Sequence, residues 1–121
     1  MTEIINRQRK TKLDWQIFEK FADSAIQAIP ETENKTATIA LISDRQMRKL
    51  NREFRGKNST TDVLSFPFEP DEFETEENTL GDILISVEQA KKQAAENDLP
   101  LETEIKQLIL HGILHLCGFD H

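Results

Sequence analysis

The chain has 121 residues, enough for one compact domain with a continuous core and too few for two. Hydrophobic residues make up 37% and charged residues 31%, and no apolar stretch approaches the roughly 20 residues that span a bilayer, so no membrane span is expected. The net charge of −7 argues against a generally basic nucleic-acid-binding protein, but the charge is segregated, with six basic side chains in residues 45–57 and six acidic ones in residues 69–77.

The N-terminal stretch MTEIINRQRKTK is charged where a secretory signal would need its apolar region, so we expect a cytoplasmic protein. Within it, Ile4 and Ile5 predict a short first strand. Between residues 13 and 29 the apolar side chains recur at helical spacing, and Pro30 ends the pattern. This stretch predicts an amphipathic helix.

The next segment predicts a buried strand followed directly by a helix. Residues 36–42, TATIALI, are nearly continuous in apolar character and partly β-branched, as expected of a buried strand. Ser43 with Gln46 makes a capping box, which opens a helix that reaches about residue 54. The outer face of this helix carries most of the basic cluster.

Two further strands are predicted on either side of an acidic stretch. Residues 62–66, DVLSF, form one strand, ended by Pro67, and residues 80–86, LGDILIS, form the other. The acidic residues 69–78 between them are typical of a solvated loop. Residues 87–97, rich in Ala, Lys and Gln, predict a helix.

A last helix is predicted over residues 101–117, with Gly118 where helices commonly stop. The only cysteine, Cys117, points away from the histidine side of this helix, so we expect it in the core and in no intrachain disulfide. Four strands and four helices in mixed order predict an α+β fold, a small mixed β-sheet with helices packed against it. Residues 1–121 are expected to form a single domain.

All three histidines lie in the C-terminal segment HGILHLCGFDH. His111 and His115 are one helical turn apart, so both imidazoles project from one face and can share an ion. Gly118 lets the chain turn back, which would bring His121 to the same ion. Three neutral nitrogen ligands with a fourth position open for water are the arrangement of a catalytic zinc site.

The alternative without a metal is that the two helical histidines are ordinary surface or core residues and that the terminal histidine is incidental. The third histidine at HxxxHxxGxxH spacing favours metal over this alternative. One zinc ion suits the ligands best, although imidazole also binds nickel, copper and iron.

The same spacing resembles HExxHxxGxxH of the metzincin peptidases, with one departure. The glutamate that serves those enzymes as general base is Gly112 here, and glycine cannot transfer a proton. A peptidase mechanism is therefore disfavoured even if the metal geometry is similar.

Three stretches also resemble the YbeY endoribonucleases, the rRNA maturation factor family. They are LNREFRGKNSTTDVLSFPFE (50–69), LGDILIS (80–86) and HGILHLCGFDH (111–121), and the last is close to the family signature HGxLHLxGxDH. Members of the family usually continue past the third histidine, often as a further helix. We therefore expect the domain to lack a C-terminal extension.

The resemblance implies a metal-dependent, single-strand-specific endoribonuclease that acts in ribosomal RNA maturation, including processing of the 16S rRNA 3′ end, and in ribosome quality control. It implies ribosomal RNA and the small ribosomal subunit as partners. It further implies an α+β fold related to the zincin peptidases, with the three histidines as zinc ligands and Arg55 as a site residue. Oligomeric state is not implied.

Arg55 lies in FRGK, just past a predicted helix, where its guanidinium can grip a phosphate through two parallel hydrogen bonds. Without the resemblance, an ordinary exposed arginine explains the position equally well. The resemblance favours a catalytic role.

Asp62, Asp82 and Asp120 are candidates to accept a hydrogen bond from a ligating imidazole, although strand-end capping and turn formation explain each about as well. Glu104 is two turns before His111, too distant to act as a base. Trp15 and the seven phenylalanines lack the clustered, exposed pattern of a base-stacking platform, so most of them are expected in the core.

The sequence leaves three hypotheses for the function open. The first is RNA phosphodiester hydrolysis with zinc and Arg55. The second is a metallopeptidase or amidase that uses the same ion. The third is a non-catalytic ribosome-assembly factor in which the metal only fixes the C-terminal turn.

Overall fold

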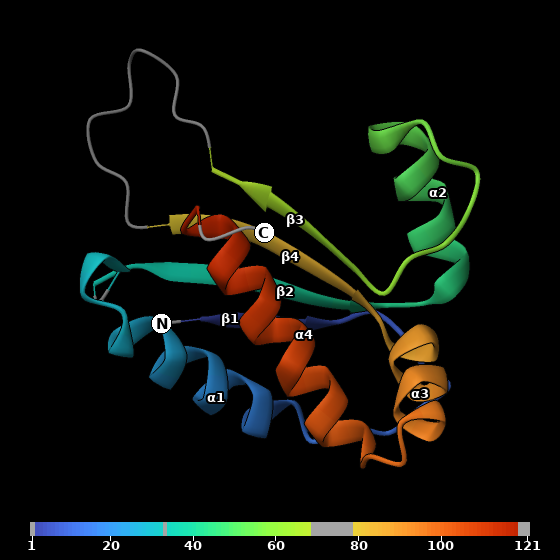
Figure 1. Cartoon of the computed structure of the whole chain (residues 1–121), viewed down its shortest axis with the longest axis horizontal. Helices are drawn as coiled ribbons and strands as arrows, with labels where there is room; N and C mark the ends of the chain where they lie inside the picture. The colour runs from blue at the N-terminus through green and yellow to red at the C-terminus, as the bar shows by residue number, and fades with distance from the viewer. Residues whose placement is uncertain (1, 33, 69–78, 119–121) are drawn as a thin grey trace.

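A computed structural model of the chain describes residues 2–32, 34–68 and 79–118. The described strands form one mixed four-stranded sheet in the order β1-β2-β4-β3, in which only β3 runs antiparallel to its neighbour. In chain order the elements are β1 (Glu3–Asn6), α1 (Trp15–Ala28), the short 3-10 helix η1 (Pro30–Thr32), β2 (Thr36–Ile42), α2 (Asp44–Arg55), β3 (Val63–Pro67), β4 (Thr79–Ser86), α3 (Val87–Glu96) and α4 (Leu101–Leu116). Figure 1 shows their arrangement.

The helices cover the two faces of the sheet unequally. In Figure 1, α1 and α4 lie against one face, and α2 lies on the other near one end of the strands. Successive strand residues alternate between the faces, so Ile39 and Leu41 of β2 enter the core beneath α1 and α4, whereas Ala40 and Ile42 face α2. Because α2 covers only part of its face, some of that sheet surface stays open.

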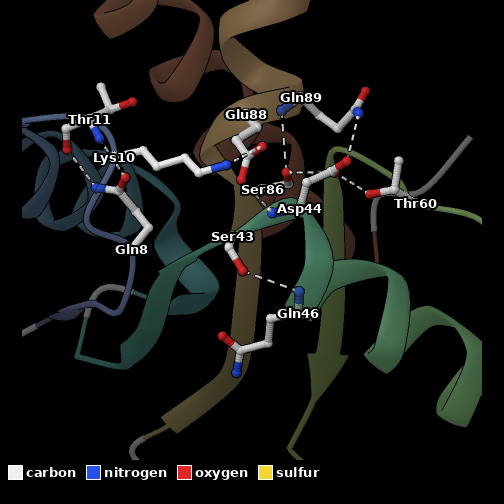
Figure 2. Close-up of polar contacts among 10 residues, drawn as sticks. All are labelled: Gln8, Lys10, Thr11, Ser43, Asp44, Gln46, Thr60, Ser86, Glu88 and Gln89. Atoms are coloured by element: carbon white, nitrogen blue, oxygen red, sulfur yellow. Dashed lines mark hydrogen bonds and ion pairs between the residues drawn. The ribbon is translucent and has the colours of Figure 1, made fainter.

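A polar network holds the beginning of α2 against the beginning of α3 (Figure 2). Asp44 Oδ1 accepts hydrogen bonds from the Thr60 hydroxyl and from Ser86 Oγ at 3.0 Å, and Oδ2 accepts one from Gln89 Nε2 at 3.3 Å. The Asp44 backbone N–H in turn donates to Glu88 Oε1 at 3.1 Å. The carboxylate lies at helix N-termini, where negative charge is favoured, so the network fixes the position of α2 relative to β4.

The end of α2 is set by Gly56. This residue adopts a left-handed conformation with φ 68°, and its N–H donates to the Arg52 carbonyl at 3.1 Å. Glycine carries no Cβ penalty there, which makes it the usual residue after a helix end. The turn sends the chain on toward β3 and leaves Arg55 as the last helical residue.

A second glycine permits close contact between β3 and β4. Gly81 has φ 137°, and a Cβ added to it would lie 2.2 Å from the Phe66 carbonyl oxygen. The register of β2 against β4 shifts at the same place, so β4 contains a bulge there. Beyond the bulge, Ile83 faces α4 and Asp82 faces the opposite side of the sheet.

The predicted α+β fold is confirmed, and each predicted helix and strand lies within two residues of the observed one. Two details differ. Pro67 is the last residue of β3 and not beyond it, because β3 is an edge strand where a missing N–H costs no ladder bond. The helix η1 was not predicted. The acidic stretch 69–78 lies outside the described residues, and no helix within those residues is long and apolar enough to cross a membrane.

Candidate functional site

Helix α4 brings His111 and His115 to one side of a pocket at the edge of the sheet. The pocket has a volume of about 300 Å³ and is lined by Arg55, Val63, Leu64, Ser65, His111 and His115. His111 is exposed and His115 is partly buried. The two imidazoles thus share one helix face and one cavity, as their spacing predicted.

Gly112, the residue after His111 in the signature, faces the sheet and not the pocket. Gly112 is buried, and a Cβ built on it would lie 2.8 Å from Ile83 Cγ2 and 2.9 Å from Ile83 Cδ1. A glutamate at this position would be driven into β4. The close approach of α4 to β4 therefore gives Gly112 a packing role and removes this position as a source of a general base.

Arg55 enters the same pocket from a distant part of the chain. It is exposed at the end of α2, and the turn at Gly56 carries the chain away so that its side chain is free to face β3. The sequence spacing between Arg55 and the histidines carried no information on this proximity. Tertiary packing makes Arg55 line the same cavity as His111 and His115.

The end of α4 behaves as predicted. The helix ends at Leu116, and Gly118 takes a left-handed φ of 88° with its N–H donating to the His115 carbonyl at 3.0 Å. Cys117 packs against the main core, and burial, followed by the nearby Glu31 carboxylate, raises the pKa of its thiol. A thiol with a raised pKa is a poor nucleophile and metal ligand at neutral pH.

Of the three aspartates proposed as partners of the imidazoles, Asp62 and Asp82 do not line this pocket. Asp62 Oδ1 accepts from the Val63 N–H at 2.8 Å and Oδ2 accepts from Gln93 Nε2 at 3.2 Å, so this carboxylate caps the start of β3 and ties it to α3. Asp82 faces the opposite side of the sheet, because side chains alternate along β4. For Asp62 the structure supports the strand-end capping alternative, Asp82 does not line the pocket, and Asp120 lies outside the described residues.

The described residues include two of the three predicted metal ligands. His111 and His115 are two nitrogen donors on one helix face, which fits a transition metal such as zinc or nickel. The predicted third ligand, His121, lies outside the described residues, and within residues 2–32, 34–68 and 79–118 no group of three His, Cys, Asp or Glu side chains is placed to hold an ion. Glu104 is buried earlier in α4 and does not line the pocket.

Two features of the site were missed from the sequence. Ser65 lines the histidine pocket; the signal was a single polar residue inside the apolar strand DVLSF, on the face opposite Leu64 and Phe66. Phe54 and Phe66 form an edge-to-face pair with ring centroids 5.3 Å apart, and Phe54 is 63% exposed. The aromatic residues were expected mostly in the core, but Phe54, Trp15 and Phe68 are exposed.

The cations predicted on one face of α2 do gather there. A shallow groove of about 580 Å³ is lined by Ser43, Arg45, Gln46, Arg48, Lys49 and Arg52. Within the described part of the chain the ion pairs are Lys10 with Glu88 and Lys106 with Glu102, so none of the α2 cations is neutralised by a described acid. A local positive surface exists on a chain with net negative charge.

The chain was compared with known families, proteins and structures. A family model described as "Endoribonuclease YbeY" matches residues 3–121. The proteins named endoribonuclease YbeY from Persephonella marina and Carboxydothermus hydrogenoformans are 43% and 40% identical over 111 and 126 residues, which cover 89% and 100% of this chain and 72% and 83% of theirs. A third relative of that name, from Clostridioides difficile, is 37% identical over 96% of this chain and 80% of its own.

A solved structure also matches the fold. The solution structure of TM1509 from Thermotoga maritima superposes with a TM-score of 0.68 at 27% identity, covering 100% of this chain and 75% of that one. It agrees with the mixed four-stranded sheet and helices described above. The family model extends over nearly the whole chain, including the arginine and histidine segments that meet in the pocket. On this evidence the chain belongs to the YbeY endoribonuclease family.

Proposed function

We propose that the chain is a metal-dependent endoribonuclease that cleaves single-stranded RNA in the pocket between α4 and β3. The observation that carries the proposal is the meeting of Arg55 with His111 and His115 in one cavity of about 300 Å³. Imidazole nitrogens hold a transition metal, and a guanidinium binds phosphate. A phosphodiester is the substrate class that uses both groups at once.

In this proposal His111, His115 and His121 hold the ion, with zinc preferred. The bound ion would supply Lewis-acid chemistry to the phosphodiester. The protein's contribution is to fix the first two imidazoles on a rigid helix whose position is set by the contact of Gly112 with Ile83. No described residue lining the pocket carries a carboxylate that could serve as general base.

Arg55 acts as the catalytic residue on the phosphate. Its planar guanidinium donates two parallel N–H groups to the non-bridging oxygens and stabilises the negative charge that builds on them. The Asp44 network and the Gly56 turn hold α2 so that Arg55 faces the histidines. The side chain of Ser65, on the same wall of the pocket, adds a hydroxyl donor.

The peptidase alternative is weakened by the structure. Metzincin peptidases need a carboxylate at the position of Gly112, and this position packs on Ile83 with no room for a side chain. A base would have to come from elsewhere. The arginine in the pocket suits a phosphodiester, whose two non-bridging oxygens can accept two parallel N–H groups.

The cations of α2 bind the RNA backbone away from the pocket. Arg45, Arg48, Lys49 and Arg52 line one groove and are exposed. Each phosphate contact should contribute about equally to all RNA sequences and about 0.7 to the slope of log affinity against log salt for single strands. Charge reversal at Arg48 should lower both the RNA affinity and the slope of log affinity against log salt. Unchanged RNA binding would remove this helix from the interface.

The family likeness favours ribosomal RNA as the substrate. The protein would act beside the small ribosomal subunit in the cytoplasm. On this proposal the chain takes part in ribosomal RNA maturation, such as trimming at the 16S rRNA 3′ end, and in ribosome quality control. Its support is the relatives' name together with the likeness of the three sequence stretches.

The deciding experiment incubates metal-loaded protein with single-stranded and fully paired RNA and with ribosomal RNA. Cleavage of the single strands by the wild-type chain and its loss in His111→Ala are expected, while Gln107→Ala, an exposed change on the same helix, should retain activity. Tight RNA binding with no cleavage at any metal loading would favour an assembly factor. Cleavage that survives His111→Ala would place the active site elsewhere.

A further inference from the structure

The open side of the sheet carries an apolar pocket beside the basic helix. Its volume is about 460 Å³, and its lining includes Ile5, Ala40, Leu84, Phe54 and Phe66. Phe54 is 63% exposed, the largest exposure among the large hydrophobic side chains of the described residues. An exposed aromatic ring over an apolar floor is costly in water, and such surfaces mark binding sites.

The polar groups at the rim of this pocket suit a flat heteroaromatic ligand. Arg7, Thr38, Gln46 and Asp82 line it together with the apolar residues. An apolar cavity with a few placed donors and acceptors is the usual form of a small-ligand site. Nucleobases present an aromatic face for stacking and a polar edge for hydrogen bonds, so they match both features.

The charge of the neighbouring surface selects a polyanion over a neutral ligand. Gln46 lines both this pocket and the groove of α2 cations, so the two depressions adjoin. Aromatic stacking next to a cationic groove is the general arrangement of single-strand binding surfaces.

The pocket also connects to the proposed active site across the edge strand. Phe54 and Arg55 are consecutive residues at the end of α2, and Phe54 lines the apolar pocket while Arg55 lines the histidine pocket. Along β3, Phe66 lines the first pocket and Ser65 the second, because alternate side chains face opposite sides of the sheet. One RNA strand crossing the edge of β3 would therefore meet both pockets.

We propose that the Phe54 and Phe66 pocket is a subsite for an unpaired base of the RNA strand whose backbone runs from the α2 cations to Arg55. The proposal rests on the endoribonuclease function proposed above and adds to it where a flanking base binds. It also provides a reason for single-strand preference, since a base that is paired and stacked within a duplex is not available to stack on the exposed Phe54 ring.

The test measures binding of a short, fluorescein-labelled 2′-O-methyl oligoadenylate by anisotropy, with the oligonucleotide checked to remain intact. Phe54→Ala should raise Kd about five- to tenfold, at the lower end of the range for loss of one stacked base, because much of the Phe54 ring is exposed. Phe54→Trp should restore binding. The salt slope should not change in either variant, whereas charge reversal at Arg48 should lower it.

Two controls make the assay specific. Trp15→Leu removes another exposed aromatic side chain, 43% exposed on α1 against the other face of the sheet, and should leave Kd unchanged. An oligonucleotide with abasic sites should bind wild type more weakly and should not distinguish wild type from Phe54→Ala. This cycle separates base stacking from backbone binding.

The outcomes separate the subsite from the function on which it rests. If wild-type protein cleaves and binds RNA but Phe54→Ala and Phe66→Leu bind as tightly, the subsite is refuted and the nuclease stands. If wild type binds no RNA, both fail. If Phe54→Ala leaves RNA affinity unchanged and converts a dimer to a monomer in analytical ultracentrifugation, the pocket is a protein interface and the proposal is overturned.

Discussion

Replacing Gly112 with alanine should destabilise the protein although alanine is the better helix former. Alanine in a helix interior gains about 1 kcal/mol over glycine. Against this, the new Cβ would lie 2.8, 2.9 and 3.0 Å from three atoms of Ile83, a side chain with no exposed surface. Overpacking of a core typically costs about 1–3 kcal/mol, and three simultaneous close contacts place this site in the upper half of that range.

The net loss should therefore be about 1–2 kcal/mol, measured by urea unfolding followed by circular dichroism. For a domain of this size such a loss lowers Tm by about 4–8 °C. Because relief of the contact requires α4 to move from β4, His111 should also shift, so metal content should fall together with stability. Gln107→Ala, an exposed position on the same helix, should change stability by less than about 0.5 kcal/mol.

A second background tests the stated cause. Ile83→Ala removes all three contacting atoms, at a cost of its own of about 2–5 kcal/mol. In that background Gly112→Ala should be neutral or stabilising by up to about 1 kcal/mol, which is a strong coupling between the two sites. If Gly112→Ala stabilises the wild-type chain, or costs the same in both backgrounds, contact with Ile83 does not explain the glycine.

Four further predictions concern other parts of the site and its support. Arg55→Lys keeps the charge but loses the planar fork, so the rate of single-turnover cleavage should fall about 10²- to 10³-fold with metal content unchanged. If RNA affinity falls by the same factor, Arg55 is a docking residue and not a catalytic one. Purified protein should hold about one metal ion per chain by elemental analysis, and His111→Ala or His115→Ala should lose it; equal metal in all three would refute histidine ligation. Asp44→Ala removes the acceptor of three side-chain hydrogen bonds and should cost about 1–3 kcal/mol in urea unfolding, so an unchanged midpoint would mean that the network is not needed to hold α2. Because its pKa is raised, the Cys117 thiol should react with iodoacetamide more slowly than a free thiol near pH 8. The difference in rate should shrink as the pH rises. Reaction at the free-thiol rate near pH 8 would contradict the burial of Cys117.

The local elements were predictable because their causes are local. The capping box at Ser43 is present, with Ser43 Oγ accepting from the Gln46 N–H at 3.2 Å, and the strand over residues 36–42 was predicted to the residue. The histidine pair was predictable for the same reason, since residues four apart on a helix share a face whatever the helix packs against. Departures were small and had local physical causes, such as Asp14 capping α1 and starting the helix at Trp15.

Contacts between groups on separate elements were decided only by the tertiary structure. Asp62 and Asp82 had suitable chemistry, but strand alternation and a contact with Gln93 directed them away from the imidazoles. Arg55 and His111 are far apart in sequence, and no local pattern places them in one cavity; packing of α2 and α4 about β3 does. The exposed pair of Phe54 and Phe66 also arises between segments, from a helix end and an edge strand. Sequence alone determined which groups each element carries, because propensity and periodicity act over a few residues, whereas the meeting of groups from separate elements depends on how their apolar faces pack together.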